Sequence, residues 1–95
     1  MTDPLTFDAI VAGGGSAGCV TAGRLAEGGM SVLLLEAGPG DSNPAIWDPR
    51  RSHDLWHAEE DWDFRSEPQE DVEGRRLHLP RGRVVGGSGS INGMV

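Results

Sequence analysis

The sequence predicts an α/β fold built on a Rossmann-like βαβ unit over residues 7–36. Three observations predict it: a short apolar run ends in a glycine cluster, a segment with helical spacing follows, and a second apolar run ends on an acidic residue. Two strands joined this tightly through a helix must be parallel, with a right-handed crossover. The glycine cluster then lies at the carboxyl end of the sheet, where ligands bind in such folds.

Each element has its own local signal. Phe7 to Ala12 form a mostly apolar strand that runs into three glycines. A helix begins at Ser16 and stops at the Gly28-Gly29 pair, and residues 31–35 form a second, β-rich strand before the breakers at residues 38–40. The apolar stripe expected on the helix consists of Ala17, Val20, Ala22, Leu25 and Ala26.

Residues 13–18 read G-x-G-x-x-G in the position that a dinucleotide-binding turn requires. Gly13 allows the sharp turn, Gly15 lets backbone N–H groups approach a pyrophosphate, and Gly18 lets the helix pack close to the first strand. The first helical residues, Ser16 and Ala17, then face an anion with free N–H groups and a partial positive charge. The alternative is a turn that only packs a helix on a sheet.

Glu36 ends the second strand, 18 residues after Gly18. At this place a carboxylate accepts hydrogen bonds from the ribose hydroxyls of an adenosine cofactor. It also repels a 2′-phosphate, so NAD or FAD is favoured over NADP. The residues discussed so far do not separate these two.

Composition and charge exclude several classes of protein. The chain has 95 residues and a net charge of −7, which argues against nonspecific nucleic-acid binding. It contains no apolar run long enough to span a membrane and no signal peptide at its start, so a cytoplasmic protein without membrane contact is expected. Ten of its 20 Leu, Ile, Val and Phe residues fall within the first 36 positions, which predicts an ordered N-terminal core.

Charge is distributed unevenly. Residues 37–74 carry eleven acids and three arginines and are expected to form a solvated connection, whereas residues 75–95 carry four arginines and no acid. These arginines either balance the acidic segment or serve a small phosphorylated ligand. They are Arg75, Arg76, Arg81 and Arg83.

The sequence predicts structural roles for the cysteine, for two of the histidines and for the tryptophans. Cys19 is expected to be a small packing residue on the helix. His53 and His57 are four residues apart and could share a helical face, but no third ligand accompanies them, so no metal site is expected. Trp47, Trp56 and Trp62 taken alone would also fit a binding groove, but packing is expected for them.

Three sequence blocks resemble the glucose-methanol-choline (GMC) flavoprotein oxidoreductases. They are residues 35–39 (Leu-Glu-Ala-Gly-Pro), the segment from Asp61 to Gln69, and residues 82–94, which read GRVVGGSGSINGM. The resemblance extends from Phe7 to Val95 and is greatest to the choline dehydrogenase branch.

The resemblance implies FAD in an extended form, with its pyrophosphate at residues 13–18 and its adenine ribose on Glu36. The second motif, residues 82–95, would lie along the flavin. Some members carry a histidine joined to the flavin at the position of Ile91, so noncovalent FAD is expected here. The implied cofactor-binding residues are Gly13, Gly15, Ser16, Ala17, Gly18, Glu36, Ala37, Val84, Ser88, Asn92, Gly93, Met94 and Val95.

The resemblance further implies oxidation of the CH–OH group of a small alcohol, with hydride transfer to flavin N5. The family's catalytic base lies far down the chain, so no catalytic residue is expected here and His78 is not assigned that role. Residues 1–95 would be the N-terminal part of a larger two-domain enzyme, whose remainder could be a second chain. Alternatives are an FAD-containing lyase of the hydroxynitrile lyase type, a photodecarboxylase of the same family, or a module that holds the nucleotide structurally.

Overall fold

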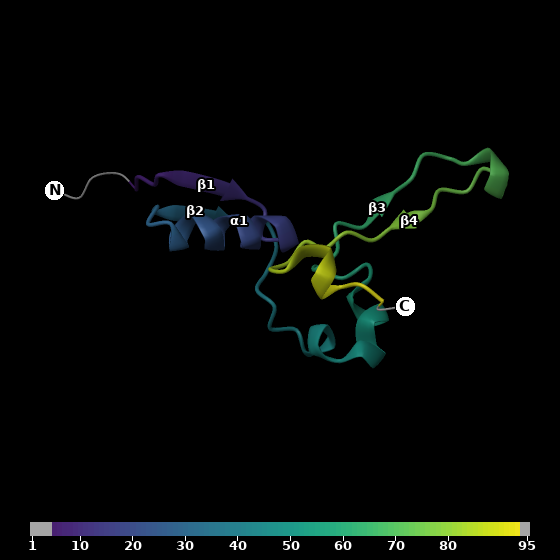
Figure 1. Ribbon diagram of the computed structural model, residues 1–95. Helices are drawn as coiled ribbons and strands as arrows, with labels where there is room; N and C mark the ends of the chain where they lie inside the picture. The colour runs from purple at the N-terminus through teal and green to yellow at the C-terminus, as the bar shows by residue number, and fades with distance from the viewer. Residues whose placement is uncertain (1–4, 94–95) are drawn as a thin grey trace.

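The first part of the chain folds into the βαβ unit that its sequence predicts. In the computed structural model, which describes residues 5–93, strand β1 spans Ala9–Ala12, helix α1 spans Ser16–Glu27 and strand β2 spans Val32–Leu35. The strands pair in parallel, with Ala9 opposite Val32 and Ala12 opposite Leu35. The predicted α/β fold is therefore confirmed (Figure 1).

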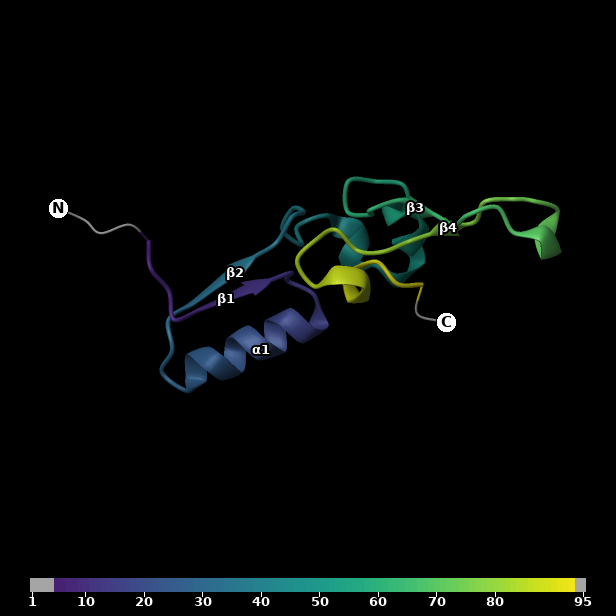
Figure 2. The ribbon, with the colours of Figure 1, turned by 90° about the horizontal axis from the view of Figure 1, so that it is seen from above.

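Helix α1 lies along one face of the two strands (Figure 2). Its half-buried positions are Gly18, Ala22 and Leu25, which follow one another at helical spacing. The predicted stripe was too wide, because Ala17, Val20 and Ala26 are exposed, Val20 to 64 %. Because α1 contacts only two strands here, the surface beneath it is too narrow to cover a wider stripe.

The opposite face of the strands is bare within residues 5–93. Val11 contacts the helix side at Gly18, whereas Ile10 points the other way and is 64 % exposed. The expectation of an N-terminal core was therefore wrong. Among residues 5–93, the hydrophobic side chains that are fully buried all lie at or after Ala45. Parallel strands bury their apolar side chains fully only when both faces are covered.

The hydrophobic core forms from later segments of the chain. Ala45, Leu55, Val84 and Ile91 make one cluster, with Ile46 packed against it. Ala45 belongs to the short 3₁₀ helix η1 (Pro44–Trp47) and Leu55 to η2 (Pro49–Leu55), which follow each other directly. Val84 and Ile91 flank a third such helix, η4 (Gly87–Ser90).

The acidic segment 37–74 is thus more than a solvated connection. It contributes half of the core cluster, and Glu60 and Asp61 are 3 % and 6 % exposed. The arginines of residues 75–95 enter no ion pair among those found in residues 5–93. They donate instead to backbone carbonyls, as Arg76 does to Ser66 and Arg83 to Glu59.

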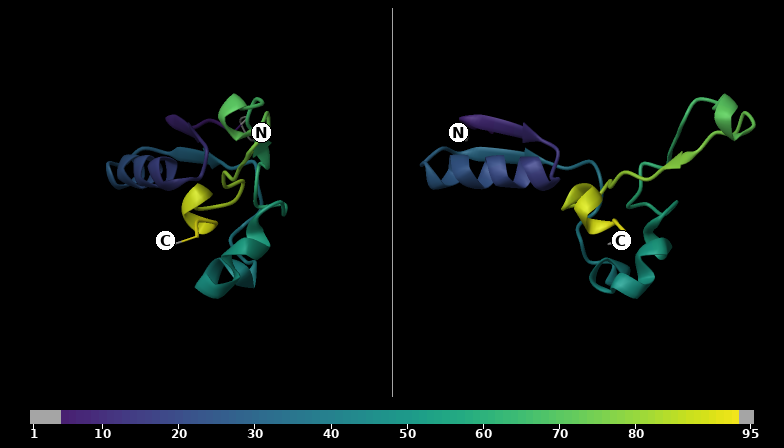
Figure 3. Two further views of the ribbon diagram at one scale, coloured as in Figure 1. Left: turned by 90° about the vertical axis from the view of Figure 1, so that its right-hand side faces the viewer. Right: turned by 45° about the vertical axis from the view of Figure 1, so that its right-hand side comes forward.

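A narrow arm extends from this core. Strands β3 (Phe64–Arg65) and β4 (His78–Leu79) pair antiparallel, and the 3₁₀ helix η3 (Glu70–Val72) lies at the turn between them. The arm projects away from the βαβ unit (Figures 1 and 3), so the molecule measures 60 × 30 × 25 Å. Its radius of gyration is 17.0 Å, against about 12 Å for a compact chain of this length. In the described part of the chain, no helix is both long and apolar enough to cross a membrane.

Candidate functional site: a two-sided glycine cradle

The turn between β1 and α1 depends on two of its glycines. Gly13 adopts φ +105°, a conformation that side chains rarely tolerate, and its N–H donates to the carbonyl of Leu35 at 2.7 Å. A Cβ on Gly18 would lie 1.8 Å from the carbonyl oxygen of Gly13. The helix therefore begins directly against the end of β1, as the spacing of the glycines predicts.

The N-terminus of α1 has no side-chain cap. Gly15 occupies the capping position and has no side-chain oxygen to accept the first helical N–H groups. The N–H groups of Ser16, Ala17 and Gly18 have no carbonyl partner within the helix. Together with the helix dipole, they favour an anionic group at this point.

A second glycine loop closes over the first one. Gly86 donates its N–H to the carbonyl of Gly14 at 2.7 Å, and Gly86 and Gly87 both adopt positive φ. A Cβ on Gly87 would lie 2.8 Å from Cα of Gly15. The backbone at Gly82 also passes close to this loop, because a Cβ on Gly82 would lie 2.1 Å from the carbonyl carbon of Gly87. The two loops therefore form a cradle that only glycine backbones allow.

Glu36 is held in a fixed position beside this cradle. Its Oε1 accepts the N–H of Gly14 at 2.9 Å, and its Oε2 accepts the N–H of Gly38 at 2.8 Å. Each carboxylate oxygen keeps capacity for a further hydrogen bond. The carboxylate is thus oriented before any ligand arrives.

A pocket of about 510 Å³ lies between these parts. Trp62 forms one of its walls; its ring lies parallel to that of Phe64 at a centroid distance of 5.9 Å, and the Arg83 guanidinium lies 5.4 Å from its centroid. Packing was expected of Trp62 in preference to a binding groove, and nothing in the sequence signals that this side chain faces Glu36. The lining residues are Ala12, Gly13, Gly15, Leu35, Glu36, Ala37, Trp62, Gly82 and Gly87.

Of the residues expected along the flavin, the four that the structure describes do not line this pocket. Ser88 is exposed and accepts the N–H of Gly82 through its Oγ, and the Asn92 side chain donates to the carbonyl of Gly89. Val84 is fully buried in the core, so it can offer a ligand only its backbone. Gly93 is half-buried, and Met94 and Val95 lie outside the described residues.

Cys19, two of the tryptophans and the two histidines of the 53/57 pair lie outside the pocket lined by Glu36. Cys19 is exposed rather than packed, with its Sγ 3.3 Å from the carbonyl oxygen of Gly14. Trp56 donates its indole N–H to the carbonyl of Ile91, whereas Trp47 is 71 % exposed. His57 does not pair with His53; its ring stacks on that of His78 at 3.9 Å.

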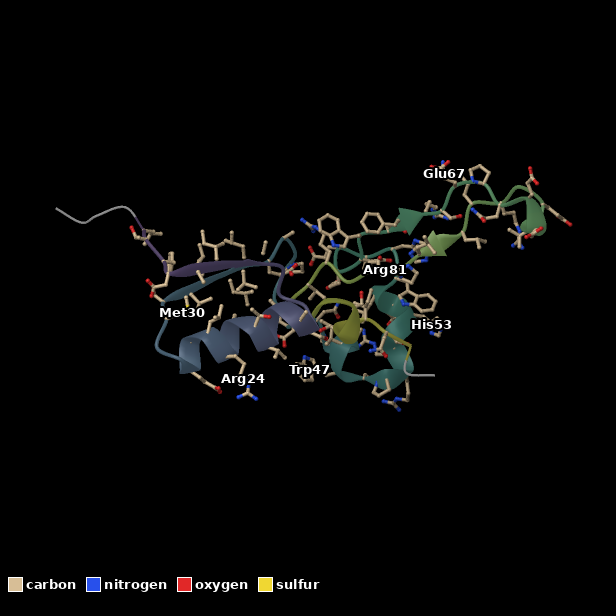
Figure 4. All side chains as sticks on the ribbon, turned by 45° about the horizontal axis from the view of Figure 1, so that its top comes forward. Arg24, Met30, Trp47, His53, Glu67 and Arg81 are labelled. Atoms are coloured by element: carbon tan, nitrogen blue, oxygen red, sulfur yellow. The ribbon has the colours of Figure 1, made fainter. Side chains whose placement is uncertain are left out.

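Asp61 organises the base of the arm. Its carboxylate accepts three backbone N–H groups, from His57, Asp63 and Arg81, and also contacts Nε2 of His78 at 2.8 Å. Burial raises the pKa of this carboxyl, but the hydrogen bonds outweigh burial and lower the pKa to about 2. Asp61 therefore holds the two sides of the arm together as an anion. Arg81 lies at this base, and Glu67 lies further out on the arm (Figure 4).

The fold and the cradle define a dinucleotide-binding protein of the Rossmann type. Residues 7–95 match the family described as GMC oxidoreductase, so the chain belongs to that family. FAD, rather than NAD, is the cofactor of this family of flavoproteins, in agreement with the sequence-based expectation.

The related sequences include members of the predicted branch. The chain is 52 % identical over 91 residues to an oxygen-dependent choline dehydrogenase of Vibrio vulnificus, covering 94 % of this chain and 16 % of that protein. It is 47 % identical over 91 residues to an alcohol dehydrogenase (acceptor) of Pseudomonas putida, with the same coverage. The chain thus spans about a sixth of the length of the relatives it matches.

Solved structures also match this chain over nearly its whole length. Pyridoxine 4-oxidase from Mesorbium loti superimposes with a TM-score of 0.86 at 43 % identity, over 94 % of this chain and 18 % of that one. Formate oxidase of Aspergillus oryzae superimposes with a TM-score of 0.81 at 38 % identity, over 97 % of this chain and 17 % of that one.

Proposed function

We propose that this chain supplies the FAD-binding part of an enzyme that oxidises the CH–OH group of a small alcohol. The observation that supports the proposal most directly is the cradle of Gly15 and Gly87 beside the fixed carboxylate of Glu36. A single phosphate-binding turn would serve any dinucleotide, whereas the second glycine loop adds a second wall, without side chains, that a planar ring can approach closely.

Each part of the cradle has a task in holding FAD. The free N–H groups at Ser16 and Ala17 would hold the pyrophosphate, and Glu36 would accept the hydroxyls of the adenine ribose. Trp62 would close the pocket on the adenosine side, which excludes water from it. When bound, FAD supplies the two-electron acceptor, with hydride passing from the carbinol carbon to flavin N5.

FAD is proposed to be held without a covalent bond. Ile91 stands where some family members carry a flavin-linked histidine, and its side chain is 2 % exposed within the hydrophobic core. An aliphatic side chain provides no nucleophile. Denaturation of the full-length protein followed by filtration should therefore release the flavin; flavin retained with the polypeptide would contradict this assignment.

The names of the relatives favour an alcohol as substrate. Choline dehydrogenase and alcohol dehydrogenase are among the most similar sequences, although formate oxidase shares this part of the fold. The described residues contain the cofactor cradle, and we place the base and the substrate site in the rest of the enzyme. The remainder of that enzyme and the alcohol are the partners that the proposal requires.

Anaerobic titration of the full-length protein tests the reaction class. Choline, pyridoxine and a simple primary alcohol are mixed in turn with the oxidised protein while the flavin spectrum is followed. Bleaching of the flavin by at least one of them, with one aldehyde formed per flavin, is the expected result. A protein that carries FAD but is reduced by no alcohol, and instead cleaves a hydroxynitrile or decarboxylates an acid in light, would overturn the proposal.

A further inference from the structure

Four side chains with metal-binding atoms converge at the base of the β3–β4 arm, outside the FAD cradle. They are His57, Asp61, Asp63 and His78, and one ligand atom of each lies within 4.8 Å of all the others. The first three come from the segment that enters the arm, and His78 comes from the strand that returns. The cluster therefore joins two segments that are distant in the sequence.

The spacing of these atoms is somewhat shorter than that of the ligands around a tetrahedral metal ion. His57 Nδ1 lies 2.6 Å from Asp63 Oδ1, while His78 Nε2 lies 3.2 Å from the same oxygen and 2.8 Å from Asp61 Oδ2. Ligands of a tetrahedral Zn²⁺ ion lie about 2.0–2.2 Å from the metal and hence about 3.3–3.6 Å apart. To admit an ion, the shortest contact, 2.6 Å, would have to widen by about 0.7 Å. The stacked rings of His57 and His78 would also have to turn so that both nitrogens point at the ion.

Charge and exposure also suit a cation. Two carboxylates and two neutral imidazoles balance the charge of one divalent ion, and imidazole with carboxylate is a ligand set that Zn²⁺ accepts. The side chains of His57 and Asp63 are 50 % and 42 % exposed, so an ion can enter from solvent. Asp61 and His78 are 0 % and 16 % exposed at their side chains and form the floor of the site.

We propose that His57, Asp61, Asp63 and His78 bind one divalent transition-metal ion, with Zn²⁺ as the best match, and that this ion fixes the base of the arm. The proposal departs from the sequence-based expectation of no metal site, which considered His57 only with His53. Each imidazole binds the metal in its neutral form. On each ring, the proton that lies between the coordinating nitrogen and a carboxylate oxygen moves to the other ring nitrogen or is released to solvent. The proposal does not depend on which substrate the enzyme oxidises.

Zinc binding to the full-length, flavin-loaded protein tests this site. The protein is freed of metals with a chelator and titrated with Zn²⁺ against a competing chromophoric chelator, with Mg²⁺ in a parallel titration. His57→Gln and His78→Gln remove one ligand each but keep a hydrogen-bonding side chain. His53→Gln is the matched control, because the His53 ring packs against Trp56, at 4.6 Å, outside the cluster.

One zinc ion per chain is expected, bound at micromolar concentration or tighter, with Mg²⁺ unable to displace it. Each cluster variant should weaken the affinity at least tenfold, and the control should not change it. A crystal soaked in zinc should show anomalous scattering between His57 and His78. The proposal is overturned if the wild-type protein has no such zinc site, or if H57Q binds zinc as tightly as the wild type. Because the His57 side chain is half exposed, H57Q decides the question even where H78Q fails to fold.

Discussion

Gly87 lies against Gly15, so closely that a Cβ on Gly87 would stand 2.8 Å from Cα of Gly15. The two residues belong to loops at opposite ends of the sequence, and their contact creates the two-sided cradle. The cradle therefore depends on the absence of a side chain at Gly87, where φ is +63°.

Gly87→Ala should weaken FAD binding at least tenfold. The added methyl group pushes the loops apart, and an alanine in the left-handed region costs about 1 kcal/mol more. Gly89→Ala is the matched control, because a Cβ there would meet only Ser16 Oγ at 3.7 Å. The flavin content of the purified full-length variants and titration of their apoproteins with FAD provide the measurement. Equal flavin affinity in both variants would contradict the role given to the cradle.

Glu36→Gln should lower FAD affinity by about tenfold to a hundredfold, since charge-assisted hydrogen bonds contribute roughly 1.5–3 kcal/mol each. The amide group of Gln would also face one of the N–H groups that Glu36 now accepts, from Gly14 or Gly38. Glu27→Gln, which alters only the exposed pair with Arg24, serves as the control. Isothermal titration of both apoproteins with FAD measures the difference, and similar dissociation constants would remove Glu36 from the site.

Trp62→Ala should weaken FAD binding by about tenfold, because it removes an apolar wall of the pocket. Trp62→Phe should retain most of the affinity. Trp47→Ala is the control, since that side chain is 71 % exposed and lies outside this pocket. Flavin fluorescence quenching on titration of the apoproteins distinguishes them. If Trp62→Ala and Trp47→Ala bind FAD alike, Trp62 serves packing alone, as its sequence suggested.

Gly18→Ala should destabilise the protein by about 3 kcal/mol or more, because the new Cβ overlaps the carbonyl oxygen of Gly13 and separates helix from strand. Gly23→Ala lies on the same helix with no atom within 4 Å of its Cβ, and it should instead stabilise by about 0.5–1 kcal/mol. Thermal unfolding of the two full-length variants should therefore shift in opposite directions. Parallel shifts would mean that α1 does not pack on β1 as described.

Asp61→Asn should destabilise the chelator-treated protein by about 3 kcal/mol. The amide keeps only one accepting oxygen, so it cannot replace both Oδ1, which accepts the N–H groups of Asp63 and Arg81, and Oδ2, which accepts that of His57. Asp54→Asn changes only an exposed pair with Arg51, and its effect should stay within about 0.5 kcal/mol. Urea unfolding followed by circular dichroism measures both. A midpoint for Asp61→Asn equal to that of the control would show that the base of the arm is held by other contacts.

The βαβ unit could be predicted because its signals are local. Apolar runs, helical spacing and the glycines of residues 13–18 lie within a stretch of 36 residues. Each of these local patterns favours one backbone conformation by itself. The width of the helical stripe could not be predicted in this way. The exposure of Val20 depends on how many strands lie beneath α1, which no local pattern states.

The sequence by itself determined the class of fold, the phosphate-binding turn and the acidic residue that follows it. Only the tertiary structure decided that Gly87 meets Gly15, that Trp62 faces the pocket of Glu36, and that His57 joins His78 instead of His53. The physical reason is the distance along the chain between these partners. Residues 37–93 form 3₁₀ turns and two-residue strands without a repeating pattern, so the contacts between segments are set by packing and hydrogen bonds that appear only when the chain has folded.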